Sequence, residues 1–274
     1  AFETADPKTG AITRVVALSE EKATLVFVDV AEKPVPSILR DYSAPVILRH
    51  DYADQELTHL MAYDADPFNR WEAGQTLATR VLLAGVEALR AGRTMKMPSA
   101  FVEAMGRVLT DGARDPAFAA ECLQLPSESV LAEQMAVADP DAIHSVRTHL
   151  LLEIALRYRT RFEGAFRHFA VPGAYSPDAA AAGRRALRNA ALSYIMAIDD
   201  STARALTFLE LRRAENMTGA MAALECLARS GGAERERALA MFYDKWKDEA
   251  LVVDKWFRVQ ATSDIRGAVS RGEK

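Results

Sequence analysis

The sequence predicts a mainly helical protein, an irregular α–α superhelix-like array of about ten antiparallel helices preceded by a few β-strands. Half of the 274 residues are apolar but only 8% are aromatic, a balance that suits closely packed helices. Asp-Pro pairs, which mark helix starts, recur from Asp54 onward. Apolar, β-branched runs typical of strands are concentrated in residues 1–52. These observations divide the chain into a stranded region and a helical region.

The first 52 residues predict short strands. Residues 12–18 are β-branched, and residues 23–30 form a dense apolar run that is typical of a strand buried on both faces. Pro34 and Pro36 confine the next segment to a sheet edge or an extended linker, and residues 43–50 predict a further strand. About three or four strands are too few to cover such runs on both faces. We therefore expect these strands to be poorly covered within this chain.

Asp66 and Pro67 predict the start of the first long helix. The Asp carboxylate can accept from the first-turn amides, and Pro loses nothing at a position whose N–H has no partner. Apolar residues then recur at helical spacing, at Trp71, Leu77, Ala78, Val81, Leu82, Gly85 and Leu89. This stripe predicts a long amphipathic helix with Trp71 buried as its anchor.

Further capping pairs predict the later helices. Asp or Ser precedes Pro at Asp115-Pro116, Asp139-Pro140 and Ser176-Pro177. Additional starts are expected near Pro98, Ser127, Asp200, Asn216 and Glu234. Residues 171–173 and 230–232 contain the Pro and Gly that end helices. The starts are unevenly spaced, which favours an irregular helical array over a true repeat protein.

Charge and cysteine content indicate the compartment and exclude some partners. The net charge of −4 and the pI near 5.8 argue against nucleic acid as the main partner. Cys122 and Cys226 lie within apolar helical patterns, so we expect packed thiols and a reducing, cytoplasmic location. The sequence contains neither a bilayer-length apolar run nor a signal-peptide pattern, so no membrane partner is expected.

The polar residues do not predict an active site. A zinc hydrolase needs H-E-x-x-H, whereas His144 and His149, the nearest pair of histidines, lie about 140° apart around a helix. The phosphate-loop, dinucleotide-binding and nucleophile-elbow motifs are all missing from the sequence. We therefore assign no catalytic, cofactor-binding or metal-binding residue in this chain.

Two other clusters have a functional and a structural interpretation. Arginines at 157, 159 and 161, followed by Arg167-His168, could bind an anion, but Glu153 and Glu163 interleave with them and favour a solvated helix side. Asp-Lys-Trp occurs at residues 244–246 and 254–256 and could form an aromatic cage. Packing of Trp246 and Trp256 at helical spacing explains the second pattern better.

Three stretches together resemble the aminopeptidase N family of gluzincin zinc metallopeptidases, specifically its bacterial alanyl aminopeptidase branch. The first comprises residues 33–40 (K-P-V-P-S-I-L-R), 42–46 (Y-S-A-P-V) and 64–75 (D-A-D-P-F-N-R-W-E-A-G-Q). The second is residues 214–218 (A-E-N-M-T) with its apolar continuation to 227. The third comprises residues 243–246, 251–257 and 260–263. The order and spacing of these stretches extend over nearly the whole chain.

The resemblance implies a domain assignment. Residues 1–52 would end a small β-sandwich domain, and residues 53–274 would form part of a large C-terminal helical domain. The family's H-E-x-x-H motif, further Glu ligand, G-A-M-E-N motif and catalytic Tyr belong to a catalytic domain that this sequence lacks. Asn216-Met217 is not that substrate-binding motif. The resemblance thus implies a non-catalytic, internal portion of a longer enzyme.

The resemblance also implies a function for the parent protein. It would be a zinc-dependent hydrolase of peptide catabolism that removes N-terminal residues, with broad specificity favouring small or basic side chains. This inactive portion would form a helical bowl that covers the active site and limits access to peptides. Its expected partners are peptide substrates and the catalytic domain. The alternative is a free-standing helical scaffold for a protein partner, against which the uneven helix spacing and stranded N-terminus argue.

Overall fold

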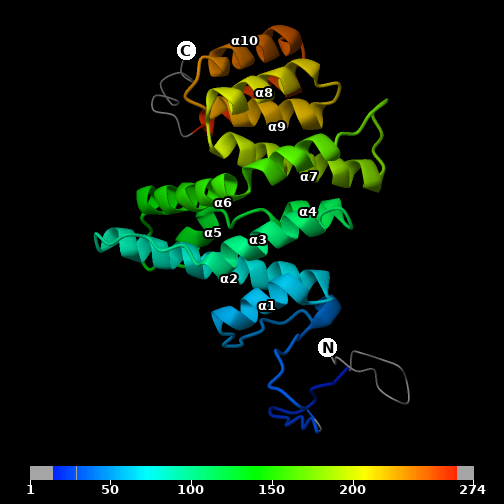
Figure 1. Ribbon diagram of the computed structural model, residues 1–274, viewed down its shortest axis with the longest axis vertical. Coiled ribbons are helices and arrows are strands. Elements are labelled where there is room, and N and C mark those ends of the chain that lie inside the picture. Colours follow the sequence, from blue (N-terminus) through cyan, green and yellow to red (C-terminus); the bar gives the residue numbers. More distant parts are fainter. Residues whose placement is uncertain (1–14, 29, 264–274) are drawn as a thin grey trace. The chain divides into compact units, whose positions relative to one another are not determined.

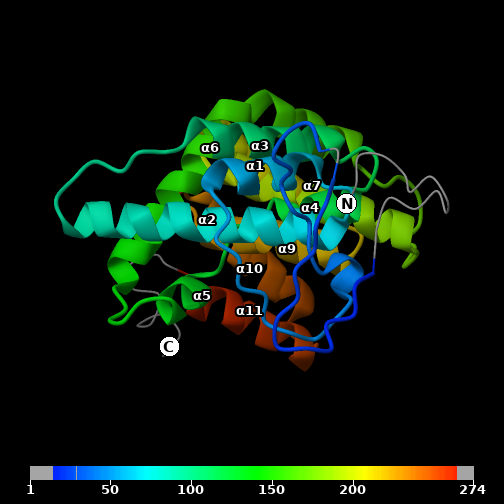
Figure 2. The same cartoon turned by 90° about the horizontal axis from the view of Figure 1, so that it is seen from below.

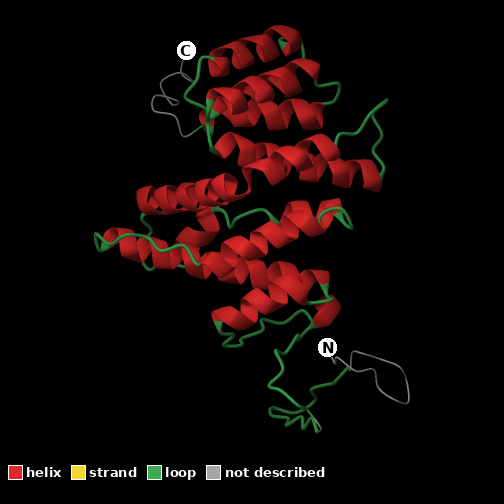
Figure 3. Cartoon of the chain, viewed as in Figure 1, coloured by secondary structure: helices red, strands yellow, loops and turns green. Residues whose placement is uncertain are grey.

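The computed structural model describes residues 15–28 and 30–263, and within these ranges the chain forms helices and loops (Figure 3). Figure 1 labels most of the helices and colours them along the sequence. Their bounds are η1 Arg40–Tyr42, α1 Asp54–Tyr63, α2 Pro67–Arg90, α3 Ser99–Asp111, α4 Pro116–Cys122, α5 Glu128–Glu133, α6 Pro140–His168, α7 Ala179–Ala197, α8 Ser201–Arg213, α9 Met217–Ala228, α10 Glu234–Trp246 and α11 Ala250–Ala261. The predicted mainly helical class is confirmed.

The chain divides into two compact units, of which the first ends at Leu77 and the second begins at Ala78. In the second unit α6 packs on α7, and α7 also contacts α4 and α9 (Figure 1). The α9 helix in turn contacts α8 and α10, and α10 lies beside α11 (Figure 2). Each helix therefore buries its apolar face mainly against helices that are close in the sequence, as in helical repeat arrays.

Most helix starts follow the predicted capping chemistry. At α2, α4 and α6, the carboxylates of Asp66, Asp115 and Asp139 accept the backbone N–H three residues later, at 2.8, 3.0 and 3.1 Å. Pro occupies the first position of each of these helices. The starts expected near Pro98, Ser127, Asp200, Asn216 and Glu234 are those of α3, α5, α8, α9 and α10. Capping depends on a few adjacent residues, so the sequence alone identifies it.

Two helix boundaries differ from the prediction. The start at Ser176-Pro177 is wrong, because α7 begins at Ala179 and Asp178 is its cap. The Asp178 carboxylate accepts both the Ala181 N–H at 2.9 Å and the Ser176 hydroxyl at 2.5 Å. The starts that the sequence predicts do not include that of α11. Its cap residue, Glu249, makes no side-chain capping hydrogen bond, so the usual sequence signal is missing there.

The inner face of α2 matches the predicted stripe in the middle of the helix but not at its two ends. Leu77, Ala78, Val81 and Leu82 are buried as expected, but Trp71 is only half-buried and Leu89 is exposed. The predicted burial of Trp71 is therefore wrong. In the first unit, small residues take the inner position instead. A Cβ added at Gly74 would lie 3.5 Å from the Met61 Cγ of α1, so the two helices are in van der Waals contact at this glycine.

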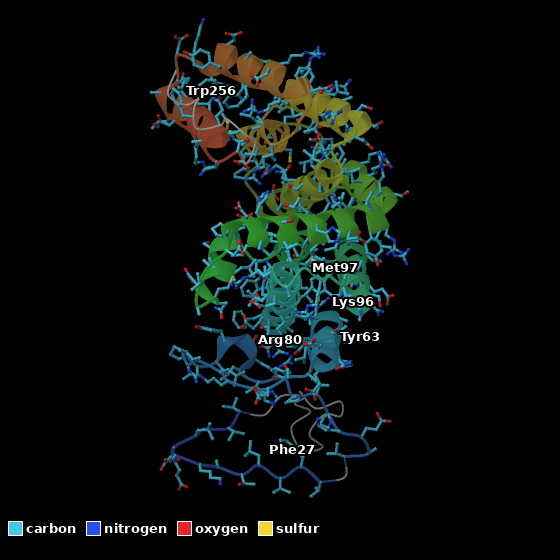
Figure 4. All side chains as sticks on the ribbon, turned by 90° about the vertical axis from the view of Figure 1, so that its left-hand side faces the viewer. Phe27, Tyr63, Arg80, Lys96, Met97 and Trp256 are labelled. Carbon is cyan, nitrogen blue, oxygen red and sulfur yellow. The ribbon has the colours of Figure 1, made fainter. Side chains whose placement is uncertain are left out.

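The N-terminal residues do not form the predicted strands within the described ranges 15–28 and 30–53; residues 12–14 and 29 lie outside them. The side chains of Leu25, Val26, Phe27 and Val28 are 51–77% exposed, and Figure 4 shows Phe27 on this extended segment. A strand is stable only when a neighbouring strand pairs with its backbone and its apolar face is covered. The described residues supply no such neighbour.

Aromatic and polar contacts hold the middle of the second unit together. The rings of Phe162 (α6) and Tyr194 (α7) stack in nearly parallel planes with centroids 4.3 Å apart. The Tyr194 hydroxyl donates to the Leu123 carbonyl at 2.7 Å, and burial raises the pKa of this phenol well above its usual value. Arg188 of α7 donates to both carboxylate oxygens of Glu210 on α8. These contacts join α6 to α7 and α7 to α8.

The long helix α6 is kinked at Tyr158, whose φ of −122° and ψ of 22° lie outside the helical range. The buried Tyr158 ring lies directly against Gly106 of α3. A Cβ added at Gly106 would approach the Tyr158 Cζ to 2.3 Å, closer than any real contact of this kind. Glycine at position 106 is therefore required by the close packing of α3 against α6.

We predict that G106A and G164A have opposite effects on stability. G106A forces the Tyr158 ring to move and should lower the free energy of unfolding by about 1–3 kcal/mol. Gly164 lies in the same long helix as Tyr158, with nothing within 4 Å of an added Cβ. G164A should therefore raise stability by about 0.5–1 kcal/mol through better helix propensity. Urea unfolding of both variants is the measurement, and equal shifts would contradict the close contact.

We also predict uneven hydrogen exchange along the chain. Amides of residues 25–28 should exchange at nearly the rate of an unstructured peptide, since they lie in no helix or strand and their side chains are exposed. Amides of residues 78–86, in the buried part of α2, should be strongly protected. A monomer in which both sets are equally protected would show that the N-terminal segment completes its own sheet.

Candidate functional site

A buried carboxylate at the start of α2 joins two separate segments of the first unit. Asp66 is only 3% exposed. Its Oδ1 accepts the Asn69 N–H at 2.8 Å and so caps α2, while its Oδ2 accepts the Asp41 N–H, also at 2.8 Å. One side chain thus begins the first long helix and holds the turn at η1 against it.

An ion pair beside Asp66 reinforces this connection. The Arg40 guanidinium donates to Asp64 Oδ1 at 2.8 Å, and the two side chains are 13% and 2% exposed. Arg40 also donates to the Ser37 hydroxyl at 3.0 Å, and the Asn69 side-chain amide donates to the same oxygen at 2.9 Å. We call this group the junction, comprising Ser37, Arg40, Asp41, Asp64, Asp66 and Asn69.

The junction stabilises an unfavourable backbone conformation. Leu39, Asp41 and Tyr42 have φ values of 56°, 55° and 52°, in the left-handed region that costs a non-glycine residue about 1–2 kcal/mol. Such a turn persists only where surrounding contacts hold it. Here it presents Tyr42, which is 58% exposed, edge-on to Phe68 at 5.1 Å. The junction positions backbone and aromatic side chains, and the carboxylates of Asp64 and Asp66 serve in it as hydrogen-bond acceptors.

The five histidines are divided between the two units, His50 and His59 in the first and the other three in the second. His50 stacks on Tyr52 at 4.0 Å, and the His144 ring nitrogen lies 2.9 Å from the Glu128 carboxylate. The remaining three are His59 on α1 and His149 and His168 on α6. Within residues 15–28 and 30–263, no three His, Cys, Asp or Glu side chains converge into a metal-binding group. That the chain lacks a metal or catalytic residue remains a prediction.

Neither cysteine in the described ranges forms a disulfide. Burial raises the pKa of the Cys226 thiol to about 11, and the Ser193 hydroxyl lies 3.9 Å from its sulfur. A thiol with such a pKa is almost entirely protonated at neutral pH and is a poor nucleophile. Cys226 is therefore a packing residue, as its apolar surroundings in the sequence predicted.

The remaining motifs serve local structure. The Asn216 side chain accepts the Gly219 N–H at 2.9 Å and caps α9, so Asn216-Met217 is a helix start. The Trp256 indole of α11 donates to the Leu239 carbonyl of α10 at 2.9 Å, and Figure 4 labels this side chain. The Trp246 ring tilts against Phe242 at 6.4 Å instead. The two tryptophans thus have different partners, which agrees with packing and not with an aromatic cage.

The fold and these sites define a helical repeat-type domain, and comparison with known families specifies which one. Residues 54–274 match a domain of unknown function, DUF3458_C, described as ARM repeats. Residues 1–51 match a second one, DUF3458, described as having an Ig-like fold. The chain therefore belongs to the DUF3458_C family of ARM-repeat domains. The Ig-like description agrees with the strand-like sequence of the first 52 residues.

The characterised relatives are aminopeptidases. The chain is 39% identical to aminopeptidase N of Caulobacter vibrioides over 94% of its length, and 34% identical to aminopeptidase N of Escherichia coli over 92%. It covers only 30% and 29% of those proteins. A crystal structure of Legionella pneumophila aminopeptidase A with aspartic acid matches 89% of this chain and 29% of its own, with a TM-score of 0.76 and 26% identity. The predicted resemblance to the aminopeptidase N family is confirmed.

The two family matches meet between residues 51 and 54, whereas the compact units divide within α2, after Leu77. The junction lies wholly in the first unit and links residues 37–41 to the start of α2. This linkage joins the first turn of α2 and the segment before α1 into a single body. The sequence-based domain boundary after residue 52 remains a prediction.

We predict strong coupling within the Arg40–Asp64 pair. R40M and D64N should each destabilise the start of α2 by about 3 kcal/mol, because each leaves a buried polar partner uncompensated. The double variant should cost less than the sum of the two. Native-state hydrogen exchange at the Asn69 amide measures the local free energy.

The Lys33–Glu56 pair, 3.2 Å apart, provides the control for the buried pair, because its Lys33 side chain is 86% exposed. K33M should change the same local free energy by less than about 0.5 kcal/mol, since solvent around Lys33 screens this ion pair. Additive effects of R40M and D64N would show that the two side chains act independently.

Proposed function

We propose that this chain is a non-catalytic part of a zinc-dependent aminopeptidase, a hydrolase that removes N-terminal residues from peptides. The observation that supports this most directly is its similarity to aminopeptidase N along nearly its whole length, while it spans only about 30% of those proteins. The described residues offer no set of zinc ligands. The zinc and the general base would accordingly be held by a region of the enzyme outside these 274 residues.

The role we propose for the helical region is a bowl that covers the active site. An array of packed helices supplies a large curved surface at low cost, because each helix contacts mainly its neighbours. Such a surface over a catalytic centre would admit flexible peptides and exclude folded proteins. Broad specificity for small or basic N-terminal residues would then depend on the catalytic domain. The junction would keep the first helices in a constant position relative to the segment before them.

The proposed enzyme works in the cytoplasm. Two half-buried thiols without a disulfide suit a reducing compartment. No helix in the described part of the chain is both long enough and apolar enough to span a membrane. Peptide catabolism in such a compartment fits a helical domain that shields a peptidase from intact proteins.

We predict that the 274-residue chain alone neither binds stoichiometric zinc nor hydrolyses aminoacyl anilides. Metal analysis after dialysis against zinc, and an anilide assay with and without chelator, measure both properties. The parallel sample is the intact protein that contains this chain, which should bind zinc and lose activity to the chelator. Chelator-sensitive turnover by the 274-residue chain would overturn the assignment of the chemistry to another domain.

The bowl has its own test in the intact protein. One substrate is a short peptide, and the other is the same N-terminal sequence fused closely to a folded domain. Release of the first residue should be at least about a hundredfold faster from the peptide, a difference in barrier of about 3 kcal/mol. Equal rates would contradict restricted access while leaving the peptidase assignment intact.

The description of residues 54–274 as ARM repeats also supports a second candidate, a scaffold that binds a protein partner. Arrays of this kind commonly use their extended surface for protein recognition. Assays of peptidase activity and of complex formation with the intact protein distinguish the two candidate functions. Peptidase activity that is unaffected by any partner favours the first, and an inactive intact protein that forms a stoichiometric complex favours the second.

A further inference from the structure

A hollow of about 470 Å³ lies between α3 and α6 in the second unit. Leu109 and Thr110 line it from the end of α3, and Ala113 from the turn that follows. The opposite wall is formed by Arg161, Ala165, His168 and Phe169, at the C-terminal end of α6. Its volume lies within the range of small-molecule sites, which is about 300–1,000 Å³.

The lining combines an apolar floor with basic side chains. Leu109 and Phe169 are buried, whereas Arg161 and His168 are exposed to solvent. Arg161, Ala165 and His168 occupy positions i, i+4 and i+7 of α6, so the two basic groups share one helix face about two turns apart. None of the described lining residues is acidic.

The acidic residue that the sequence places beside Arg161 is engaged elsewhere. The Glu163 carboxylate accepts from Arg159 Nε at 3.1 Å, and Arg159 also pairs with Asp200 at 2.7 Å. Arg161 makes no ion pair within the described ranges. Its guanidinium lies over the Tyr158 ring, with its central carbon 5.1 Å from the ring centroid. A guanidinium held by one face keeps the N–H groups at its edges available for an anion.

The backbone that carries the other basic residue, His168, is held in place by Arg184 of α7. Arg184 donates to the carbonyls of His168 and Ala170, and so binds the end of α6. Its guanidinium lies over the Phe169 ring at 5.4 Å, and the His168 ring meets Phe169 edge-on at 4.8 Å. These contacts fix the end of α6 at the rim of the hollow, and Arg184 places a positive charge beside it.

We propose that this hollow binds a carboxylate that carries a short apolar group. The Arg161 guanidinium would pair with both carboxylate oxygens, since its planar N–H groups match that geometry. The imidazole of His168 would add a hydrogen bond, and the apolar group would rest on Leu109 and Phe169. This binding goes beyond the proposed function, because it requires no peptide hydrolysis.

Two kinds of ligand carry this chemistry, namely a free N-acylated amino acid and the C-terminal residue of a peptide. The probes are N-acetyl-leucine, its amide, and N-acetyl-Ala-Ala-Leu with a free or an amidated C-terminus. Calorimetric titration of the 274-residue chain measures affinity, and NMR shifts of the His168 ring report the location. Each free acid should bind at least about tenfold more tightly than its amide, as expected for loss of a charged hydrogen bond.

R161M should weaken binding of the acids about tenfold or more. The matched control is R157M, because the Arg157 guanidinium also lies near the Tyr158 ring, at 5.9 Å, but does not line the hollow. R157M should leave affinity within about twofold. A113F fills the hollow from its rim without changing charge, and should abolish binding even if R161M proves unstable.

The possible results distinguish the two ligand sources from each other, and both from failure of the proposal. Tighter binding of the tripeptide acid than of N-acetyl-leucine would identify a peptide C-terminus, and equal binding would identify free carboxylates. Equal affinity for acids and amides would overturn the proposal. So would equal losses in R157M and R161M, unchanged binding in A113F, or no binding at millimolar concentration.

Discussion

The buried carboxylate of Asp66 is the constraint on which the beginning of this structure depends. One of its oxygens accepts the Asn69 N–H in the first turn of α2, and the other accepts the Asp41 N–H in the η1 turn. A buried carboxylate must be well hydrogen-bonded, because desolvation of the charge is costly. Both segments must therefore be in place together. The left-handed residues of the turn are tolerated because this carboxylate and the Arg40–Asp64 pair hold them.

The second unit is assembled from local contacts of a different kind. Stacked rings between α6 and α7 and the paired Arg188 and Glu210 between α7 and α8 join consecutive helices. Close approach depends on glycines at specific points, above all Gly106 under the Tyr158 ring. An array of this type extends by adding neighbours and leaves broad helix surfaces exposed. Such surfaces suit a domain that covers or binds something else.

Arginines on one stretch of α6 serve two separate purposes. Arg159 takes part in ion pairs with Glu163 and Asp200, which join α6 to the start of α8. Arg161, two residues further on, lies over an aromatic ring at the edge of a hollow. Residues two apart on a helix point in very different directions, so neighbours in sequence face different surroundings. One charge-rich stretch of a helix can thus contribute one residue to structural ion pairs and another to a candidate anion site.

The sequence by itself determined the helical class, most helix starts and the family resemblance. Capping by Asp66, Asp115 or Asp139 involves only a single turn, so local chemistry decides it. Tertiary structure alone decided that Trp71 is half-buried, that Asp66 also binds the Asp41 amide, and that Arg159 pairs with Asp200 at the start of α8. The hollow beside Arg161 is likewise formed by residues from two helices, α3 and α6, and the turn after α3. These features depend on distances between elements, which packing sets and which no local pattern in the sequence encodes.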